Sequence, residues 1–548
     1  MPAADVVGDV MSELTEIRVL IVEPHTGMRG SMHNMLNLCG VTKIEHGVSA
    51  GTSIGIIRKK YFDLILCEYD LGIGQDGQQL LEDIRHHQLA PLSTIFFMVT
   101  AERSYEKVVS AAELAPNDYL LKPFTPDDLM ERVNRALKKR VIFMPIYTLM
   151  ENGDHQGAIA SCLQKEQLAD RDQVDFMRLR AELHILMGEP EMAEPIYQKL
   201  TEMRTVAWAK LGMAKSIHLQ GRYDEAEQLL ETLVSENEQY MDAFDLLAKN
   251  HEESGQLELA KDVLNAAVAI SPHGVHRLRR LGAIALRTGD LDCAELNLKK
   301  VVNKVKYSEF KDPEDHVHLV NALVQMGQID QAKSVLRDLE RSMPDKVKTA
   351  ACRAISTMFI HAKNNDPRLT EEITAAVVAN RENIGLSTSL KLDLAKNCLD
   401  SNMEDEASSV ILEVMRNSTN DKEIQRAIGV FESAGKGQLG NQLAEQSRTE
   451  VMELVAAGVQ KAKLGDFRGA VDLMSSAVKQ LPNNPQVVMN AALAYLKCLE
   501  NHGWEHSMAE QARRLIASAC KLDPTNTRNE ALKKMYDDLQ KKYGIGRS

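Results

Sequence analysis

The chain has 548 residues, of which 44% are hydrophobic and 26% charged, and a formal net charge of −13 at pH 7. It is too long for one hydrophobic core, so several domains are expected. The acidic balance argues against nucleic-acid binding, which needs a surplus of Lys and Arg. The N-terminus is acidic and no stretch reaches about 18 uncharged apolar residues, so we expect a cytoplasmic protein without membrane insertion.

The first part of the chain alternates short apolar runs with helical segments. After a flexible tail over residues 1–16, strands are predicted at 18–22, 41–45, 62–67, 94–99 and 118–121. Continuously apolar strands are typical of a buried parallel sheet. A last helix is expected to be capped by Thr125, to begin at Pro126 and to end near Arg140. These elements predict an α/β doubly wound parallel sheet, whose ligand site lies beyond the carboxyl ends of the strands.

Polar residues stand at those strand ends. They are Glu23-Pro24 after the first strand, Glu68 and Asp70 after the third, Thr100 at the end of the fourth, and Lys122-Pro123 after the fifth, with Tyr119 three residues before Lys122. With Asp76-Gly77, this arrangement resembles the receiver domain of bacterial response regulators (flavodoxin-like) over residues 17–140. The resemblance implies that a histidine kinase phosphorylates an aspartate at the end of the third strand with the help of magnesium. Lys122 and Thr100 would then hold the phosphoryl group, and Tyr119 would report it by rotating.

The sequence departs from that pattern at two positions. Pro24 replaces the second acid that follows the first strand, so Glu23 is left as the one candidate magnesium ligand, and we expect no cofactor unless Mg²⁺ binds there. The phosphoacceptor position aligns with Glu68, which directly follows the apolar run DLILC. Gly77 follows Glu68 by nine positions, one more than the usual spacing, which leaves Asp70 as the alternative.

Glu68 can be interpreted in two ways. A glutamate carboxylate projects about 1.5 Å further than that of aspartate, toward Lys122 and Thr100. It either mimics part of the phosphorylated state in a pseudo-receiver, or forms a fixed structural ion pair with Lys122. Both interpretations predict that ordinary aspartyl phosphorylation does not occur.

The rest of the chain repeats one pattern. Gly153, Gly188, Gly221, Gly255, Gly289 and Gly327 follow one another at 35, 33, 34, 34 and 38 residues, each with an alanine five residues later. These spacings bracket the 34-residue period of the tetratricopeptide (TPR) repeat, a pair of helices joined by a tight turn. One such pair cannot bury its apolar face alone, so an all-α TPR solenoid with a concave surface is predicted.

The regularity of this pattern divides the repeats into three parts. Regular repeats are expected over residues 141–344 and degenerate helical repeats over 345–446, where Asn402 replaces the glycine. C-terminal repeats and a closing helix are expected over 447–548, because the glycine step returns at Gly465. No Gly/Ser-rich linker precedes the first repeat, which favours rigid coupling to the receiver-like domain.

One repeat carries a basic region on this acidic protein. His276, Arg279 and Arg280 belong to it and are predicted to bind an acidic peptide or protein in the concave groove. The alternative is a solvated helix face neutralised by Asp290, Asp292 and Glu295.

No catalytic signature appears, and we expect no enzyme activity. We interpret the chain as a response-regulator-type signalling adaptor of a bacterial two-component pathway. Its partners would be a histidine kinase or another two-component signalling protein and a ligand of the repeats. One alternative is a genuinely phosphorylated receiver, at Asp70 or Glu68, that switches the repeats. Another is an assembly scaffold for secretion or surface appendages with a vestigial receiver.

Overall fold

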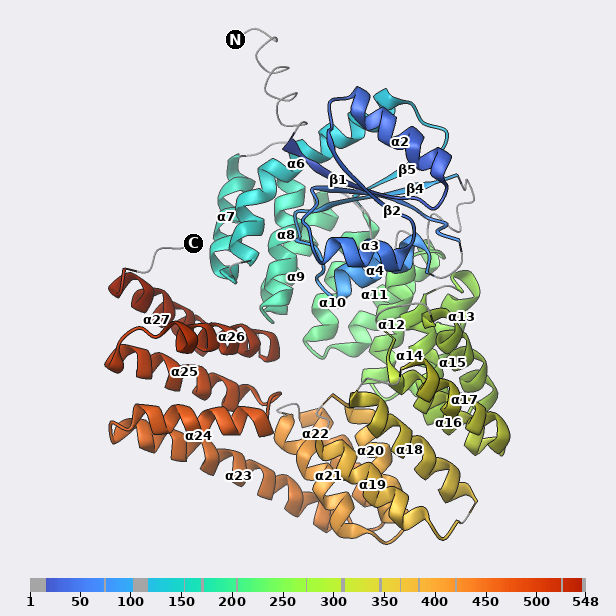
Figure 1. Ribbon diagram of the computed structural model, residues 1–548, viewed down its shortest axis with the longest axis vertical. Coiled ribbons are helices and arrows are strands. Elements are labelled where there is room, and N and C mark those ends of the chain that lie inside the picture. The colour runs from blue at the N-terminus through green and yellow to red at the C-terminus, as the bar shows by residue number, and fades with distance from the viewer. Residues whose placement is uncertain are drawn as a thin grey trace. The chain divides into compact units, whose positions relative to one another are not determined.

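The computed structural model describes residues 16–72, 75–101, 117–151, 153–168, 172–203, 206–272, 274–306, 311–343, 347–364, 366–382, 385–418, 421–523 and 526–544 (Figure 1). Apart from Glu16, the predicted tail lies outside these residues. The chain divides into two compact units, Met1–Ile185 with Glu189–Ala322, and Leu186–Gly188 with Leu323–Ser548.

The N-terminal domain is a five-stranded parallel sheet in the order β2-β1-β3-β4-β5. The strands are β1 (Arg18–Val22), β2 (Lys43–Gly47), β3 (Leu64–Glu68), β4 (Ile95–Thr100) and β5 (Asp118–Leu121), and the described helices are α2 (Thr26–Leu38), α3 (Ala50–Ile57), α4 (Gly77–His86) and α6 (Pro126–Glu151). The predicted doubly wound fold is confirmed. Strands β2 and β3 begin two residues later than predicted.

Two hydrophobic cores explain why the strands are apolar throughout. Alternate residues of a strand point to opposite faces of the sheet. Ile21 and Phe97 pack with α2 and α6 on one face, whereas Leu20 and Met98 pack with α3 and α4 on the other. Because both faces are covered, no position of β3 or β4 is left for a solvated side chain.

Helix α6 joins the sheet domain to the repeats without a linker. It begins as predicted, with Thr125 Oγ1 accepting a hydrogen bond from Asp128 N (3.1 Å) and Asp128 accepting one from Thr125 N (3.0 Å). It then continues for 26 residues, past the predicted domain boundary at residue 140. The last helix of the sheet domain and the first helix of the repeats are therefore one helix.

In the described part of the chain, the remaining elements are all helices. They are α7 (His155–Leu168), α8 (Gln173–Leu186), α9 (Pro190–Met203), α10 (Ala207–Leu219), α11 (Tyr223–Glu236), α12 (Met241–Glu253), α13 (Leu257–Ile270), α14 (Val275–Thr288), α15 (Leu291–Val305), α16 (Pro313–Gln325), α17 (Ile329–Ser342), α18 (Val347–Lys363), α19 (Leu369–Glu382), α20 (Thr388–Asp400), α21 (Glu404–Asn417), α22 (Asp421–Ser433), α23 (Gly437–Lys463), α24 (Phe467–Gln480), α25 (Pro485–His502), α26 (His506–Leu522) and α27 (Arg528–Lys542). The predicted all-α region is confirmed. Among the described residues, none of the helices combines the length and apolarity needed to cross a bilayer.

The turns of the repeats show why glycine recurs. Each glycine of the series from Gly153 to Gly327 has a positive φ, between 69° and 86°, where a Cβ atom is strained. Asn402, with a φ of 58°, takes the same place in the degenerate region, which asparagine tolerates best among residues with a side chain. The alanines that follow, such as Ala260 and Ala294, are fully buried where the helices of a pair cross.

The predicted boundaries within the repeats remain predictions. Helix α23, a single run of 27 residues, continues across the predicted boundary between residues 446 and 447. The region from 345 to 446 forms helices throughout its described part. The eight cysteines form no disulfides, and five of them are buried.

Close helix packing makes Gly282 a sensitive position. A Cβ atom on this residue of α14 would lie 2.6 Å from Leu298 Cγ of α15, and both residues are buried. We expect Gly282→Ala to lower the free energy of unfolding by about 1–3 kcal/mol through overpacking. Gly429→Ala in α22 is the control, because a Cβ atom there would meet no neighbour within 4 Å. This substitution is expected to raise the free energy of unfolding by up to about 1 kcal/mol. Urea unfolding followed by circular dichroism compares the two, and equal effects would contradict the packing argument.

Candidate functional site

The carboxyl ends of four strands bring the predicted pocket residues together. Glu23 directly follows β1, Glu68 is the last residue of β3, Thr100 is the last residue of β4, and Lys122 directly follows β5. All four ends lie at the same edge because the strands are parallel. Residues up to 99 positions apart in the sequence therefore share one site.

Lys122 bridges the two glutamates of this pocket. Its Nζ donates to Glu23 Oε2 (2.9 Å) and to Glu68 Oε2. The Glu23 side chain is fully buried, and those of Glu68 and Lys122 are only 9% and 14% exposed. The pocket thus contains one ammonium between two carboxylates, with little water to screen them.

Burial dominates the ionisation of Glu68. Because burial penalises the charged carboxylate, it raises the pKa of Glu68, against the opposing effect of the Lys122 ammonium. Burial also disfavours the charged form of Lys122, but its hydrogen bonds to Glu68 and Glu23 outweigh this and raise the pKa of Lys122. Lys122 is therefore the resident cation of the pocket.

The pocket residues do not fit a magnesium ion. Mg²⁺ requires several oxygen ligands in near-octahedral geometry, and Pro24 offers no carboxylate. Glu23 Oε1 accepts a hydrogen bond from His25 N (2.9 Å), and Glu23 Oε2 is bound to Lys122. Among the described residues, no group of three His, Cys, Asp or Glu side chains could hold a metal ion.

Glu68 and Asp70 occupy different surroundings. Asp70 is exposed, and its Oδ1 accepts a hydrogen bond from Gly72 N (2.9 Å) within the loop. Glu68, by contrast, contacts Lys122 directly and accepts a hydrogen bond from Asp70 N through Oε1 (3.3 Å). Gly77, the first residue of α4, lies against the end of β3. A Cβ atom on this residue would lie 2.3 Å from the carbonyl oxygen of Glu68, so only glycine fits at this position.

Thr100 and Tyr119 complete the predicted pocket. Thr100 is buried, and its carbonyl oxygen accepts a hydrogen bond from Lys122 N (2.8 Å). Tyr119 is half-buried, and its ring packs against the core that contains Val22, Cys67 and Met98. The Tyr119 ring therefore lies on the face of the sheet that α3 and α4 cover.

The predicted docking residues of the repeats are engaged in ion pairs. His276 pairs with Asp245 (3.1 Å), Arg279 with Asp315 (2.6 Å) and Arg280 with Glu252 (3.0 Å). These acids come from α12 and α16 and not from the predicted neutralising set, whose Asp290 pairs with Lys261 and Glu295 with Lys299. Partner binding at His276, Arg279 and Arg280 remains a prediction, and a partner would have to compete with these contacts.

Arg277 belongs to the same basic region, but sequence reasoning did not predict that it is buried. Arg277 is fully buried and binds Asp245 through Nε (2.9 Å) and Nη2 (2.7 Å). A signal was present, because Arg277 precedes Leu281 and Ile284 by four and seven residues and so lies on the core face of the helix.

Comparison with known proteins matches the sheet domain to one family. The model of the response regulator receiver domain matches residues 19–134. This region is a receiver domain. It is 28% identical over 124 residues to the chemotaxis protein CheY-3 of Vibrio cholerae, a match that covers 22% of this chain and 93% of that protein. A CheY-like receiver domain protein from Methanospirillum hungatei is 30% identical, with a TM-score of 0.21, over 23% of this chain and 95% of that one.

The receiver domain is fused to a TPR-like helical region. A tetratricopeptide repeat model matches residues 207–232, which contain α10 and the first part of α11. The crystal structure of a tetratricopeptide repeat protein from Parabacteroides merdae is similar over 50% of this chain and 98% of that one, at 16% identity and a TM-score of 0.35. Receiver and repeats together support a response-regulator-type role in protein interaction.

Proposed function

We propose that this protein is a cytoplasmic signalling adaptor of a two-component pathway, with a receiver that works without aspartyl phosphorylation. The receiver would contact a histidine kinase or another two-component signalling protein. The repeats would bind a second protein, and the chain would act through binding and not through catalysis.

One observation carries this proposal: the Lys122 ammonium lies between Glu68 and Glu23. In a receiver that accepts phosphate, the corresponding lysine is expected to meet the phosphoryl group. Here the Glu68 carboxylate already supplies the negative charge that Lys122 binds. The position of Asp70 favours the same conclusion, because Asp70 is exposed and directed to Gly72.

A small phosphodonor tests the proposal. We expect no stable phosphoryl adduct after the full-length protein is incubated with acetyl phosphate and Mg²⁺, because the pocket offers neither a metal site nor a free acceptor carboxylate. Intact-mass spectrometry followed by peptide mapping measures the adduct. A stable adduct on Asp70 or Glu68 would instead favour the phosphorylated-receiver alternative.

A further inference from the structure

Of the described receiver helices α2, α3 and α4, α4 is the one whose outer surface is covered. In α2 and α3 the outer faces are open to solvent, with exposed residues such as Asn34 and Thr52. In α4 every residue from Gly77 to Arg85 is buried or half-buried, although the sequence GQQLLEDIR is mostly polar. One face of α4 packs on the sheet through Leu80, Leu81 and Ile84. A polar helix buried on both sides needs a second covering surface.

The polar stripe of α4 identifies what lies near it. Gln78, Glu82 and Arg85 are four and three residues apart, so they share one side of the helix. Gln78 is only 7% exposed. Arg85 lies close enough to Tyr147 of α6 for the two side chains to interact electrostatically. Glu82 lies within the same kind of range of His276 of α14. The outer face of α4 is therefore turned toward helices of the repeats.

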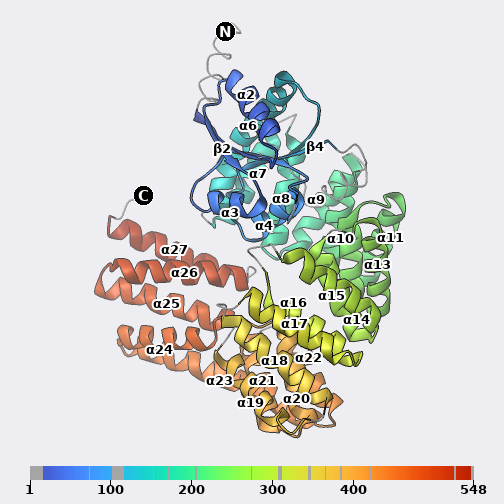
Figure 2. The same ribbon diagram turned by 45° about the vertical axis from the view of Figure 1, so that its right-hand side comes forward.

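These two neighbours come from repeats far apart in the sequence. Tyr147 lies in the first helix of the first helix pair, and His276 in the first helix of the fifth. Glu82 and Arg85 are separated by only about 4.5 Å along the helix axis. The first and fifth repeats of a curved solenoid approach one short helix only on its concave side. Receiver and repeats as far as Ala322 form one compact unit, and α4 lies on the repeat-facing edge of the receiver in both Figure 1 and Figure 2.

Two ion pairs hold the receiver in this position. Arg140 of α6 pairs with Asp63, which precedes β3 (2.7 Å), and also contacts Tyr61. The adjacent Lys139 pairs with Asp175 in the first turn of α8 (2.8 Å). Neighbouring residues of one continuous helix thus bind the sheet domain and the second repeat.

We propose that helix α4 of the receiver occupies the concave face of the repeats from α6 to α14 as an intramolecular ligand and closes that face to other proteins. The occupant matches the ligand chemistry predicted for the groove, since Glu82 is an acid within electrostatic range of His276. The contact itself does not depend on the adaptor role proposed above. Its use as a gate does rest on that role, because a gate needs a partner to exclude.

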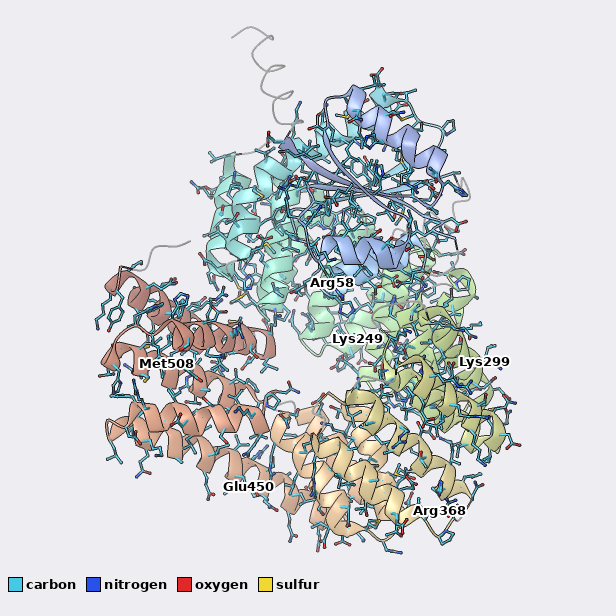
Figure 3. All side chains as sticks on the ribbon, viewed as in Figure 1. Arg58, Lys249, Lys299, Arg368, Glu450 and Met508 are labelled. Atoms are coloured by element: carbon cyan, nitrogen blue, oxygen red, sulfur yellow. The ribbon has the colours of Figure 1, made fainter. Side chains whose placement is uncertain are left out.

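Two substitutions on α4 test the contact in the full-length protein. Gln78→Trp places a bulky ring on the covered side of α4, and Glu82→Lys reverses the charge that acts on His276. The matched controls are Asn34→Trp on the exposed face of α2 and Glu131→Lys on the exposed face of α6. Arg58→Trp, at the exposed end of α3, is a further control on the same side of the sheet (Figure 3).

Hydrogen–deuterium exchange gives the readout. Both α4 variants should speed exchange of the α14 peptide Val275–Thr288 at least about fivefold, while the strands β1 and β3 keep their protection and the controls change nothing. Small-angle X-ray scattering should show a larger radius of gyration for the α4 variants alone. Unchanged α14 exchange and an unchanged radius in both variants would overturn the proposal, as would equal effects in the controls. The acetyl phosphate experiment tests the proposed function separately, so either idea can fail alone.

Discussion

Replacing Pro24 and Glu68 together by aspartate is expected to create a receiver that acetyl phosphate labels in the presence of Mg²⁺. Glu68→Asp withdraws the carboxylate by about 1.5 Å, which separates it from Lys122 and leaves room for a phosphoryl group. Pro24→Asp adds a second carboxylate beside Glu23, as a magnesium site requires. We expect the adduct to rise from background in the natural sequence to a readily measured fraction in the double variant, as seen by intact-mass spectrometry.

The single variants separate the two defects. Pro24→Asp alone should stay unlabelled, because Glu68 still holds Lys122. Glu68→Asp alone should be labelled at most weakly, because one metal ligand is still missing. Asp70→Asn in the double variant is the control for the acceptor and should leave the adduct unchanged. Loss of the adduct in that control would show that Asp70 accepts the phosphoryl group, contrary to our assignment of Glu68.

Arg277→Ala is expected to destabilise the repeats by about 3–5 kcal/mol. Asp245 is largely buried, and the substitution removes the guanidinium that binds both of its carboxylate oxygens. Arg287→Ala on the same helix is the matched control. Arg287 is 36% exposed and shares Glu252 with Arg280, so its loss should cost at most about 1 kcal/mol. The chain has two tryptophans, Trp208 and Trp504, one in each compact unit. In a Trp504→Phe background, Trp208 fluorescence during urea unfolding therefore reports on the unit that contains Arg277.

The Arg277–Asp245 ion pair also predicts that the stability of the folded state depends on pH. Burial opposes ionisation of Asp245, but hydrogen bonds from His276 and Arg277 and the charge of Arg277 lower its pKa from 3.8 to about 2. A lowered pKa stabilises the folded state above about pH 4, and this contribution is lost as the pH falls through about 2. In Arg277→Ala the pKa of Asp245 should return toward its ordinary value, so this pH dependence should shrink. Equal destabilisation by Arg277→Ala and Arg287→Ala, with identical acid unfolding, would contradict the role of the buried pair.

Features that depend on local physical chemistry could be predicted from the sequence. The sheet follows from the apolar runs, and its parallel order places Glu23, Glu68 and Lys122 at one edge before any coordinates are known. The repeats follow from the glycine steps, because a positive φ is a property of one residue. The start of β2 was wrong by two residues because Val41 is fully buried although it precedes the strand, and burial alone does not distinguish a strand from the loop that leads into it.

The sequence by itself therefore determined the receiver fold, the helix pairs and the acids and lysine available to the pocket. Apart from the Glu68–Lys122 pair, which was one of the two interpretations of the sequence, tertiary structure alone decided which charges meet. It placed Lys122 between two carboxylates, paired the basic residues of α14 with acids some 30 residues away, and covered the polar face of α4. The reason is physical. Periodicity records which face of an element is apolar, whereas an ion pair depends on how separate elements pack. The distance between the two charges is therefore not encoded in any local stretch of the chain.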